Sequence, residues 1–350
     1  MASDKGTDEG TVANDRRGFM KVASLGAAAG VAGKFSLAPV SSAVAQETTH
    51  ETWWPSKWGP EDESGSTNHM TPEKVLSSLA TVQDGRVYKL GRTYEAGIPF
   101  FGARVFALRI PGAPTGGPFG SNKLIYNDEF LATEIGQVGT QFDGLGHIGI
   151  QLGEDGDKRE MRYYNGFTEQ EIGNAYGLMK LGVEKLKPIV TKAHLIDAAG
   201  LKGGMMDVGQ EITLQDVRDA LARQEMSEDD IEPGDAVLFH TGWGQLWMQN
   251  NDRFNSGCPG IGMEVAEWVV EKDLGMVGSD TWPTEVIPNP DPEVAFPVHG
   301  HLLTKHGIVN HENLFFDEVI ADGKFRFVYM FTPMPIKGAT GSAGCPIAIS

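Results

Sequence analysis

Residues able to bind a metal ion or to transfer protons gather in two parts of this 350-residue chain. The first part runs from Gln137 to His147 and carries four polar side chains: Gln137, Gln141, Asp143 and His147. All four occupy odd positions, so an extended backbone would project them from one face. Three intervening glycines would let a ligand approach the backbone closely. The segment is therefore a candidate for a catalytic or metal-binding pocket.

The second part is a short histidine-rich stretch near the C-terminus. It holds four of the nine histidines of the chain and one acidic residue: His299, His301, His306, His311 and Glu312. A single histidine is more often structural or exposed than a ligand. Combined with the aspartate and histidine of the first part, however, the stretch offers the oxygen and nitrogen ligands that Zn²⁺ or Mn²⁺ accepts.

Two further groups of residues are candidates with open alternatives. Asp280 and Glu285 follow the strand expected at residues 275–278, where they either orient an imidazole or cap a turn. Trp54, Trp58, Trp243 and Phe142 either form an aromatic substrate pocket or belong to the buried core.

Strand and helix patterns alternate along the chain, and this alternation predicts an α/β fold. Helices are expected at residues 71–76, 213–224, 263–273 and 301–305, and strands at 87–90, 236–239, 275–278 and 325–331. Residues 111–121 are dense in glycine and proline, which indicates either a mobile loop over the site or a plain surface connection. The last residues read as a Gly/Pro-rich tail. Without a repeat or a low-complexity linker, residues 46–350 are expected to form a single domain.

The N-terminus has the pattern of a twin-arginine export signal. Arg16 and Arg17 precede a mild apolar stretch of about half the length needed to span a bilayer, and Ala43-Val44-Ala45 offers a signal-peptidase site. Residues 1–45 are therefore expected to be removed, which leaves a soluble periplasmic or secreted protein without a membrane anchor. Because this pathway exports folded proteins, it suits a protein that acquires its metal in the cytoplasm.

Charge and cysteine content narrow the possible partners. The net charge of −18 argues against nucleic acid and anionic membranes, and favours a small-molecule substrate. Cys258 and Cys345 are the only cysteines, so they form either one bridge or two unpaired core residues. A redox enzyme is the competing class for this export route, but the chain has no CxxCH and no cysteine cluster. The letters G-x-G-x-x-G occur at residues 144–149 without a following helix, so we interpret them as chance.

With these motifs in place, the chain resembles the cyclase family, which includes bacterial arylformamidases (kynurenine formamidases), isatin hydrolases and trans-dienelactone hydrolases. Residues 137–147 are similar to the family's metal motif H-x-G-T-H-x-D-x-P-x-H. Further similar places are Trp58-Gly59-Pro60-Glu61-Asp62, Tyr164-Asn165-Gly166, Thr241-Gly242-Trp243, Pro259-Gly260-Ile261-Gly262, Ser279-Asp280-Thr281 and Glu312-Asn313-Leu314. The resemblance covers nearly the whole chain after residue 45. It implies a swivelling β/β/α domain that pairs into homodimers or higher oligomers.

The resemblance also implies roles for individual residues. Asp143 occupies a metal-ligand position, His147 a metal-ligand or acid/base position, and His299 and Glu312 the downstream ligand pair. His301 and Asp280 remain second-tier candidates. Gln137 and Gln141 stand where the motif has histidines, and their amide oxygens are poor zinc ligands. We therefore expect one divalent ion, Zn or Mn, per subunit, with a glutamine hydrogen-bonding the reacting water or the substrate.

Such a site predicts hydrolysis of a small cyclic or N-acyl carbonyl compound, such as an N-formyl-arylamine or an isatin-type lactam. A divalent cation lowers the pKa of bound water from 15.7 to about 7 and polarises a carbonyl. His147 would move the proton, a contribution of about 10² to 10⁴ in rate. Two alternatives remain: a lactone hydrolase of the trans-dienelactone type, and an inactive metal-binding or ligand-binding homologue.

Overall fold

The computed structural model describes residues 52–350, which belong to one compact unit. The predicted signal peptide lies outside these residues. A nine-stranded mixed sheet dominates the fold, with strand order β1-β17-β15-β9-β11-β13-β14-β6-β16. Its strands are β1 Val87–Lys89, β6 Gln141–Asp143, β9 Ile189–Asp197, β11 Ala236–His240, β13 Met276–Ser279, β14 Val309–Glu312, β15 Arg326–Phe331, β16 Gly341–Ala343 and β17 Ile347–Ile349.

The central strands β9, β11, β13 and β14 are parallel, and the strands on both flanks pair antiparallel. Parallel neighbours require crossover connections, and these contain the main helices. The helices are α1 Pro72–Leu79, α2 Glu169–Ile172, α3 Ala198–Lys202, α4 Leu214–Arg223, α5 Asn251–Asn255, α6 Met263–Glu271, α7 Pro297–His299 and α8 Asp317–Ala321. The α/β prediction is therefore confirmed.

Both faces of the sheet are buried, because successive side chains of a strand point in opposite directions. In β11, Ala236 and Leu238 join one apolar cluster, whereas Val237 and Phe239 join a second. The second cluster includes the apolar sides of α4 and α6. Burial on both faces explains why the parallel strands have continuous apolar sequences.

Helix starts follow the expected capping chemistry. Thr71 accepts a hydrogen bond from the backbone N–H of Lys74 at the start of α1, which has Pro72 at its first position. At α4, Thr213 and Asp216 form a reciprocal capping box. The helix expected at 301–305 is a π-helix, η7 Gly300–Lys305, which continues directly from α7.

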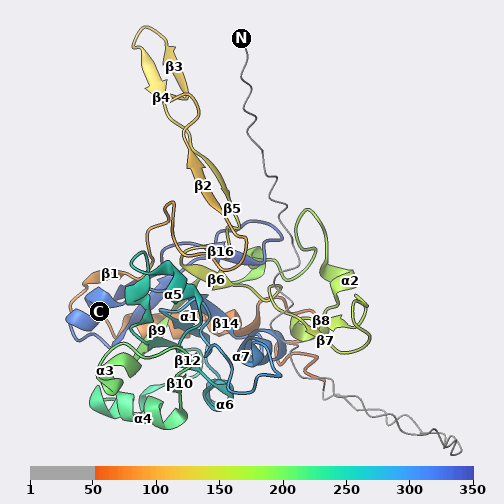
Figure 1. The fold of residues 1–350 in the computed structure, drawn as a ribbon, viewed down its shortest axis with the longest axis vertical. Helices are drawn as coiled ribbons and strands as arrows, with labels where there is room; N and C mark the ends of the chain where they lie inside the picture. The colour runs from red at the N-terminus through yellow and green to blue at the C-terminus, as the bar shows by residue number, and fades with distance from the viewer. Residues whose placement is uncertain (1–51) are drawn as a thin grey trace, which may run out of the picture. The chain divides into compact units, whose positions relative to one another are not determined.

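Residues 111–121 do not lie over the site as a loop. They belong to a long antiparallel ribbon made of β2 Phe106–Arg109 with β5 Phe130–Thr133, and β3 Gly116–Phe119 with β4 Leu124–Tyr126. The ribbon extends away from the nine-stranded sheet (Figure 1). The glycines and prolines of residues 111–121 predicted a loop, but the backbone pairing of β2 with β5 and of β3 with β4 holds the segment in a hairpin instead.

The C-terminal segment also differs from the expected irregular tail, because β16 forms one edge of the sheet and β17 pairs between β1 and β15 near the other edge. Four short strands form two further two-stranded sheets: β7 Ile150–Gln151 with β8 Met161–Arg162, and β10 Glu211–Ile212 with β12 Gly260–Ile261. Both cysteines are free; Cys258 is buried and Cys345 is exposed. Between residues 52 and 350 no helix combines the length and hydropathy that a bilayer crossing requires.

Candidate metal centre

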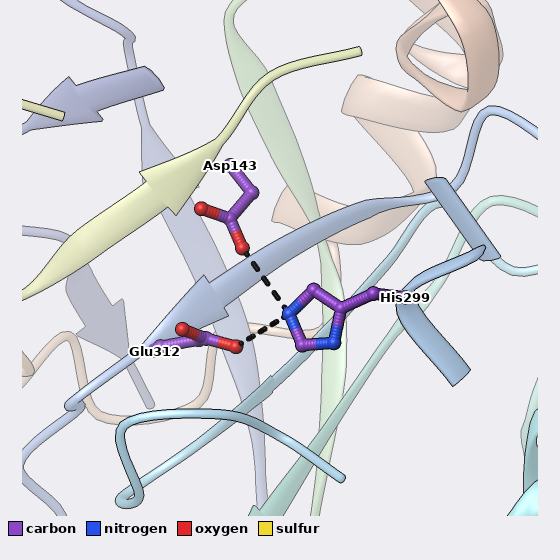
Figure 2. Close-up of side chains that lie close together, drawn as sticks. All are labelled: Asp143, His299 and Glu312. Atoms are coloured by element: carbon purple, nitrogen blue, oxygen red, sulfur yellow. Dashed lines mark hydrogen bonds and ion pairs between the residues drawn. The ribbon is translucent and has the colours of Figure 1, made fainter. Parts of the chain in front are cut away.

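Asp143, His299 and Glu312 converge on one point of the structure (Figure 2). One potential ligand atom from each lies within 4.8 Å of the others. His299 Nε2 is 3.1 Å from Glu312 Oε1 and 3.6 Å from Asp143 Oδ2. Only 1% of Asp143, 1% of Glu312 and 7% of His299 is exposed. The cluster is therefore a desolvated group of two carboxylates and one imidazole.

Strand pairing places the two carboxylates. β6 and β14 are antiparallel neighbours, with Asn310 opposite Asp143 and Glu312 opposite Gln141. Side chains two residues apart on a strand share a face, so these four residues point to the same side of the sheet. The same rule sends Phe142 to the opposite face.

His299 reaches the carboxylates from the short helix α7. The carboxylate of Glu285, which is fully buried, accepts hydrogen bonds from the backbone N–H groups of Val298 (3.3 Å) and His299 (3.0 Å). Its Oε1 also bonds to His299 Nδ1. Glu285 thus holds one side of the imidazole, and Nε2 is directed at Asp143 and Glu312. A histidine bound on its far nitrogen by a carboxylate is the arrangement found at protein metal sites.

Side-chain amides hold the carboxylates of the cluster. Gln137 Nε2 donates to Asp143 Oδ1 (3.0 Å), and Gln141 Nε2 donates to Glu312 Oε2 (2.7 Å). Asn310 Nδ2 donates to both carboxylates, at 3.2 Å from Asp143 Oδ2 and 2.6 Å from Glu312 Oε1. The glutamines therefore position the carboxylates through their nitrogens.

The charges of the cluster are strongly coupled. Burial and the nearby charge of Asp143 raise the pKa of Glu312. Burial alone would raise the pKa of Asp143, but His147, His299 and the hydrogen bond from Gln137 outweigh it and lower that pKa. Burial alone would likewise lower the pKa of His299, but its three carboxylate partners raise it well above the ordinary value.

These residues fit a divalent cation. Two buried carboxylates side by side repel one another, and a cation between them would relieve this repulsion. Carboxylate oxygen and imidazole nitrogen are donors that both Zn²⁺ and Mn²⁺ accept. Among residues 52–350 this is the one cluster of His, Cys, Asp or Glu with the proximity that a metal ion requires.

His147 stands beside the cluster, with Nε2 3.8 Å from Asp143 Oδ1. Burial lowers the pKa of His147, the nearby charges of His299 and Arg104 add to this effect, and Asp143 opposes it. The imidazole is therefore neutral near pH 7, so it can accept a proton.

A cavity of about 160 Å³ opens onto the cluster. Its polar wall includes Gln137, Gln141, His147, His299 and Glu312, and its apolar wall includes Phe101, Trp282 and Phe296. The volume is below the roughly 300–1,000 Å³ of sites for drug-sized ligands, so it suits a small molecule.

The aromatic residues predicted for the pocket lie elsewhere. Phe142 is fully buried in the core against His311 and Phe331. Trp243 is also fully buried, and its indole N–H donates to the carbonyl of Phe254. Trp58 lines a separate cavity of about 300 Å³. That cavity is larger, but no metal-ligand cluster lines it. We therefore assign the candidate active site to the smaller cavity beside Asp143, His299 and Glu312.

The two second-tier candidates are also outside the cluster. Asp280 accepts hydrogen bonds from Thr241 and from the backbone N–H of Gly244, which makes it a buried anchor for the turn after β11. The ring of His301 lies 4.7 Å from that of His306. Neither Asp280 nor His301 lines the cavity beside the cluster.

The sequence interpretation did not identify Asn310, Arg104 or the cavity aromatics Phe101, Trp282 and Phe296. A signal for Asn310 existed, because it precedes Glu312 by two residues in a strand and must share its face. The other residues come from distant segments, and aromatic residues are ordinarily a sign of the core.

Comparisons with known proteins agree with this architecture. The family model Cyclase, described as "Putative cyclase", matches residues 65–286. A solved structure described as a novel cyclase is 30% identical, with a TM-score of 0.72, and the match covers 84% of this chain and 98% of the other. Isatin hydrolase A from Ralstonia solanacearum is 19% identical (TM-score 0.54), with 80% and 98% of the two chains covered.

Isatin hydrolase A from Labrenzia aggregata, in a structure bound to benzyl benzoate, is also 19% identical, with a TM-score of 0.54 and 79% and 97% of the chains covered. At this identity the isatin hydrolases share the fold with the present chain. No curated protein sequence matches it significantly. The family model and the 30% identical structure, each matching more than half of the chain, show that the chain belongs to the cyclase family.

Proposed function

We propose that this protein is a metal-dependent hydrolase that opens a small cyclic amide or an N-acyl-arylamine. The observation that carries the proposal is the buried Asp143–His299–Glu312 cluster at the wall of a small cavity lined on one side by aromatic rings. The fold shared with isatin hydrolases supports the same reaction class. One Zn²⁺ or Mn²⁺ per subunit fits the single cluster.

A divalent ion at the cluster would supply Lewis acidity, which lowers the pKa of water and polarises a carbonyl group. The residues of the chain do the rest. His147 takes a proton from the attacking water and returns it to the leaving nitrogen as the C–N bond breaks. The water oxygen stays on the carbonyl carbon, so the products are a carboxylate and an amine. Gln137, Gln141 and Asn310 keep the carboxylates of the cluster in place during these steps.

Three substitutions test the cluster: Asp143→Ala, His299→Ala and Glu312→Ala. Each should abolish stoichiometric metal binding and reduce turnover of a panel of lactams, N-formyl-arylamines and lactones by at least about 10³-fold. Metal content is measured by elemental analysis of protein purified without chelator. Glu293→Ala removes an exposed carboxylate and serves as the control, with unchanged metal and turnover.

A variant of the three that keeps full metal occupancy and near-normal rates would remove that residue from the site. Turnover of lactones but not of amides would favour the lactonase alternative. That reaction would use the same metal cluster. A metal-loaded protein that turns over no member of the panel would favour a binding role.

We also propose that the protein is exported by the twin-arginine pathway to the periplasm or the exterior. The proposal rests on the sequence around Arg16 and Arg17 alone. Replacing both with lysine should retain the precursor in the cytoplasm, because an ammonium lacks the planar fork of the guanidinium group. Cell fractionation measures the distribution, and normal export of the double variant would contradict the assignment.

A further inference from the structure

A second cavity lies apart from the metal cluster and takes no part in the proposed reaction. Its volume is about 300 Å³, against about 160 Å³ for the cavity beside the cluster, and the two cavities share no lining residue. Three aromatic side chains line it: Trp53, Trp58 and Tyr164. A concave space of this size with aromatic walls is within the range of small-molecule sites, which begins at roughly 300 Å³.

The buried part of this cavity has its polar groups already satisfied. Tyr164 and Ser66 are both almost inaccessible to solvent. The hydroxyl oxygen of Tyr164 lies 2.7 Å from Ser56 Oγ and 2.7 Å from Asp62 Oδ2, and Ser66 Oγ donates to the carbonyl of Gly275 at 2.7 Å. A ligand therefore meets mainly an aromatic surface there, without side-chain partners waiting for a hydrogen bond.

The exposed side of the cavity is different, because it presents free hydrogen-bond donors. Within residues 52–350, three of the polar side chains that line the cavity have no hydrogen-bond or ion-pair partner: the ammonium of Lys305, the imidazole of His306 and the indole N–H of Trp58. All three side chains are exposed. A group that accepts hydrogen bonds suits this side of the cavity.

The charge of the cavity also favours an anion. Lys57 is paired with Asp273, whose carboxylate also bonds to His69 Nε2 at 3.1 Å. Among the described residues Lys305 has no carboxylate at ion-pair distance. Burial and three nearby basic side chains lower the pKa of His306 to about 4, so its imidazole is neutral near pH 7. The lining thus keeps one uncompensated positive charge, in a chain of net charge −18.

A cationic ligand fits the aromatic walls less well than an anion does. Tryptophan rings can hold an ammonium group, but here each ring already has one. Lys305 Nζ lies 6.0 Å from the centre of the Trp53 ring, and Lys57 Nζ lies 4.9 Å from that of Trp58. A second cation would be repelled by both lysines, whereas an anion would be attracted.

From these contacts we propose that the cavity is a binding site for a small aromatic carboxylate, with its ring against Trp53 and Tyr164 and its carboxylate at Lys305 and His306. Charge-assisted hydrogen bonds from the two basic side chains hold the acid group, and the aromatic walls cover the ring. A bare inorganic anion would leave those walls uncovered. The site does not depend on the proposed hydrolysis, because no residue of the metal cluster lines it.

The test is calorimetric titration of the full chain with naphthoate, neutral naphthamide and cationic naphthylmethylammonium. Naphthoate should bind about tenfold tighter than naphthamide, and the ammonium compound should bind least. Lys305→Gln should weaken naphthoate binding about tenfold and leave naphthamide binding unchanged, because only the acid uses the charge. Trp53→Leu should weaken both by a similar factor, roughly two- to tenfold, because both use the ring.

Lys180→Gln is the matched control and should bind naphthoate as wild type does. Lys180 also lies over an aromatic ring, 4.8 Å from the centre of Phe167, but it is paired with Glu61 at 3.2 Å and lies outside the cavity. A wild type that does not bind naphthoate, or binds naphthamide equally well, would overturn the proposal. So would naphthoate binding that Lys305→Gln leaves unchanged. Inorganic phosphate that binds as tightly as naphthoate and displaces it would indicate a plain anion site and also overturn it.

Discussion

Glu285 offers the sharpest test of how the metal centre is positioned. Its carboxylate is fully buried, bonds to His299 Nδ1, and accepts the backbone N–H groups of Val298 and His299. It cannot touch an ion bound at Nε2, so substitution changes only the orientation and basicity of the imidazole. Replacing a carboxylate in this role costs about 10- to 100-fold in metal affinity, or about 1.4 to 2.7 kcal/mol.

Two substitutions of Glu285 should fall at opposite ends of this range of lost metal affinity. Glu285→Gln keeps one oxygen for Nδ1–H of His299, but its amide N–H₂ then faces the N–H of Val298, where the contact is already long at 3.3 Å. We expect a loss near tenfold. Glu285→Ala also leaves the buried N–H groups unpaired, so the loss should approach a hundredfold.

Affinity is measured by competition with a chromophoric chelator. Thermal denaturation of metal-free protein separates loss of the fold from loss of the site. Glu293→Gln, at an exposed position of the same segment, is the control and should bind metal as wild type does. If both Glu285 variants bind metal as tightly as wild type, His299 is not oriented in this way and the assigned geometry is wrong.

Two further predictions concern other parts of the molecule. Gln137→His combined with Gln141→His should raise zinc stoichiometry from about one toward two, because imidazoles replace neutral amides beside Asp143; a wild type that already binds two tightly held ions would contradict this. His240→Gln should reduce the free energy of unfolding more at pH 6 than at pH 9. Burial alone would lower the pKa of His240, but Asp197, 2.7 Å away, outweighs it and raises the pKa above 6.5. The charged imidazole therefore stabilises the fold fully below pH 6.5, and this stabilisation is lost as pH rises through the folded-state pKa. Urea titrations at the two pH values measure the difference, and a pH-independent effect would refute the pairing.

Local sequence patterns were sufficient for the elements whose signals are short-range. Thr71 with Pro72 marks the start of one helix, and the periodicity of residues 213–224 predicts another; the structure shows both at the same places. The apolar run at residues 236–239 becomes a central strand. These elements can be predicted from the sequence because helix capping and strand burial depend on residues only a few positions apart.

Tertiary pairing decided the features that the sequence left open or misplaced. Residues 111–121 become part of a ribbon because β3 pairs with β4 and β2 pairs with β5. Local turn residues do not specify these pairings. Phe142 was a candidate for the pocket, but the two-residue period of β6 sends it to the core while Gln141 and Asp143 face the cluster.

The sequence alone determined which residue types were available for metal chemistry, because Asp143, His299 and Glu312 could be named from their motif positions. Only the folded chain decided that their ligand atoms lie within 4.8 Å of one another. Only the fold, too, placed Arg104 in the wall of the cavity that His299 and Glu312 line. The physical reason is that catalytic proximity comes from strand register and from the path of connecting segments. Both are set by contacts between separate segments of the chain, such as the pairing of β6 with β14, whose residues lie more than a hundred positions apart.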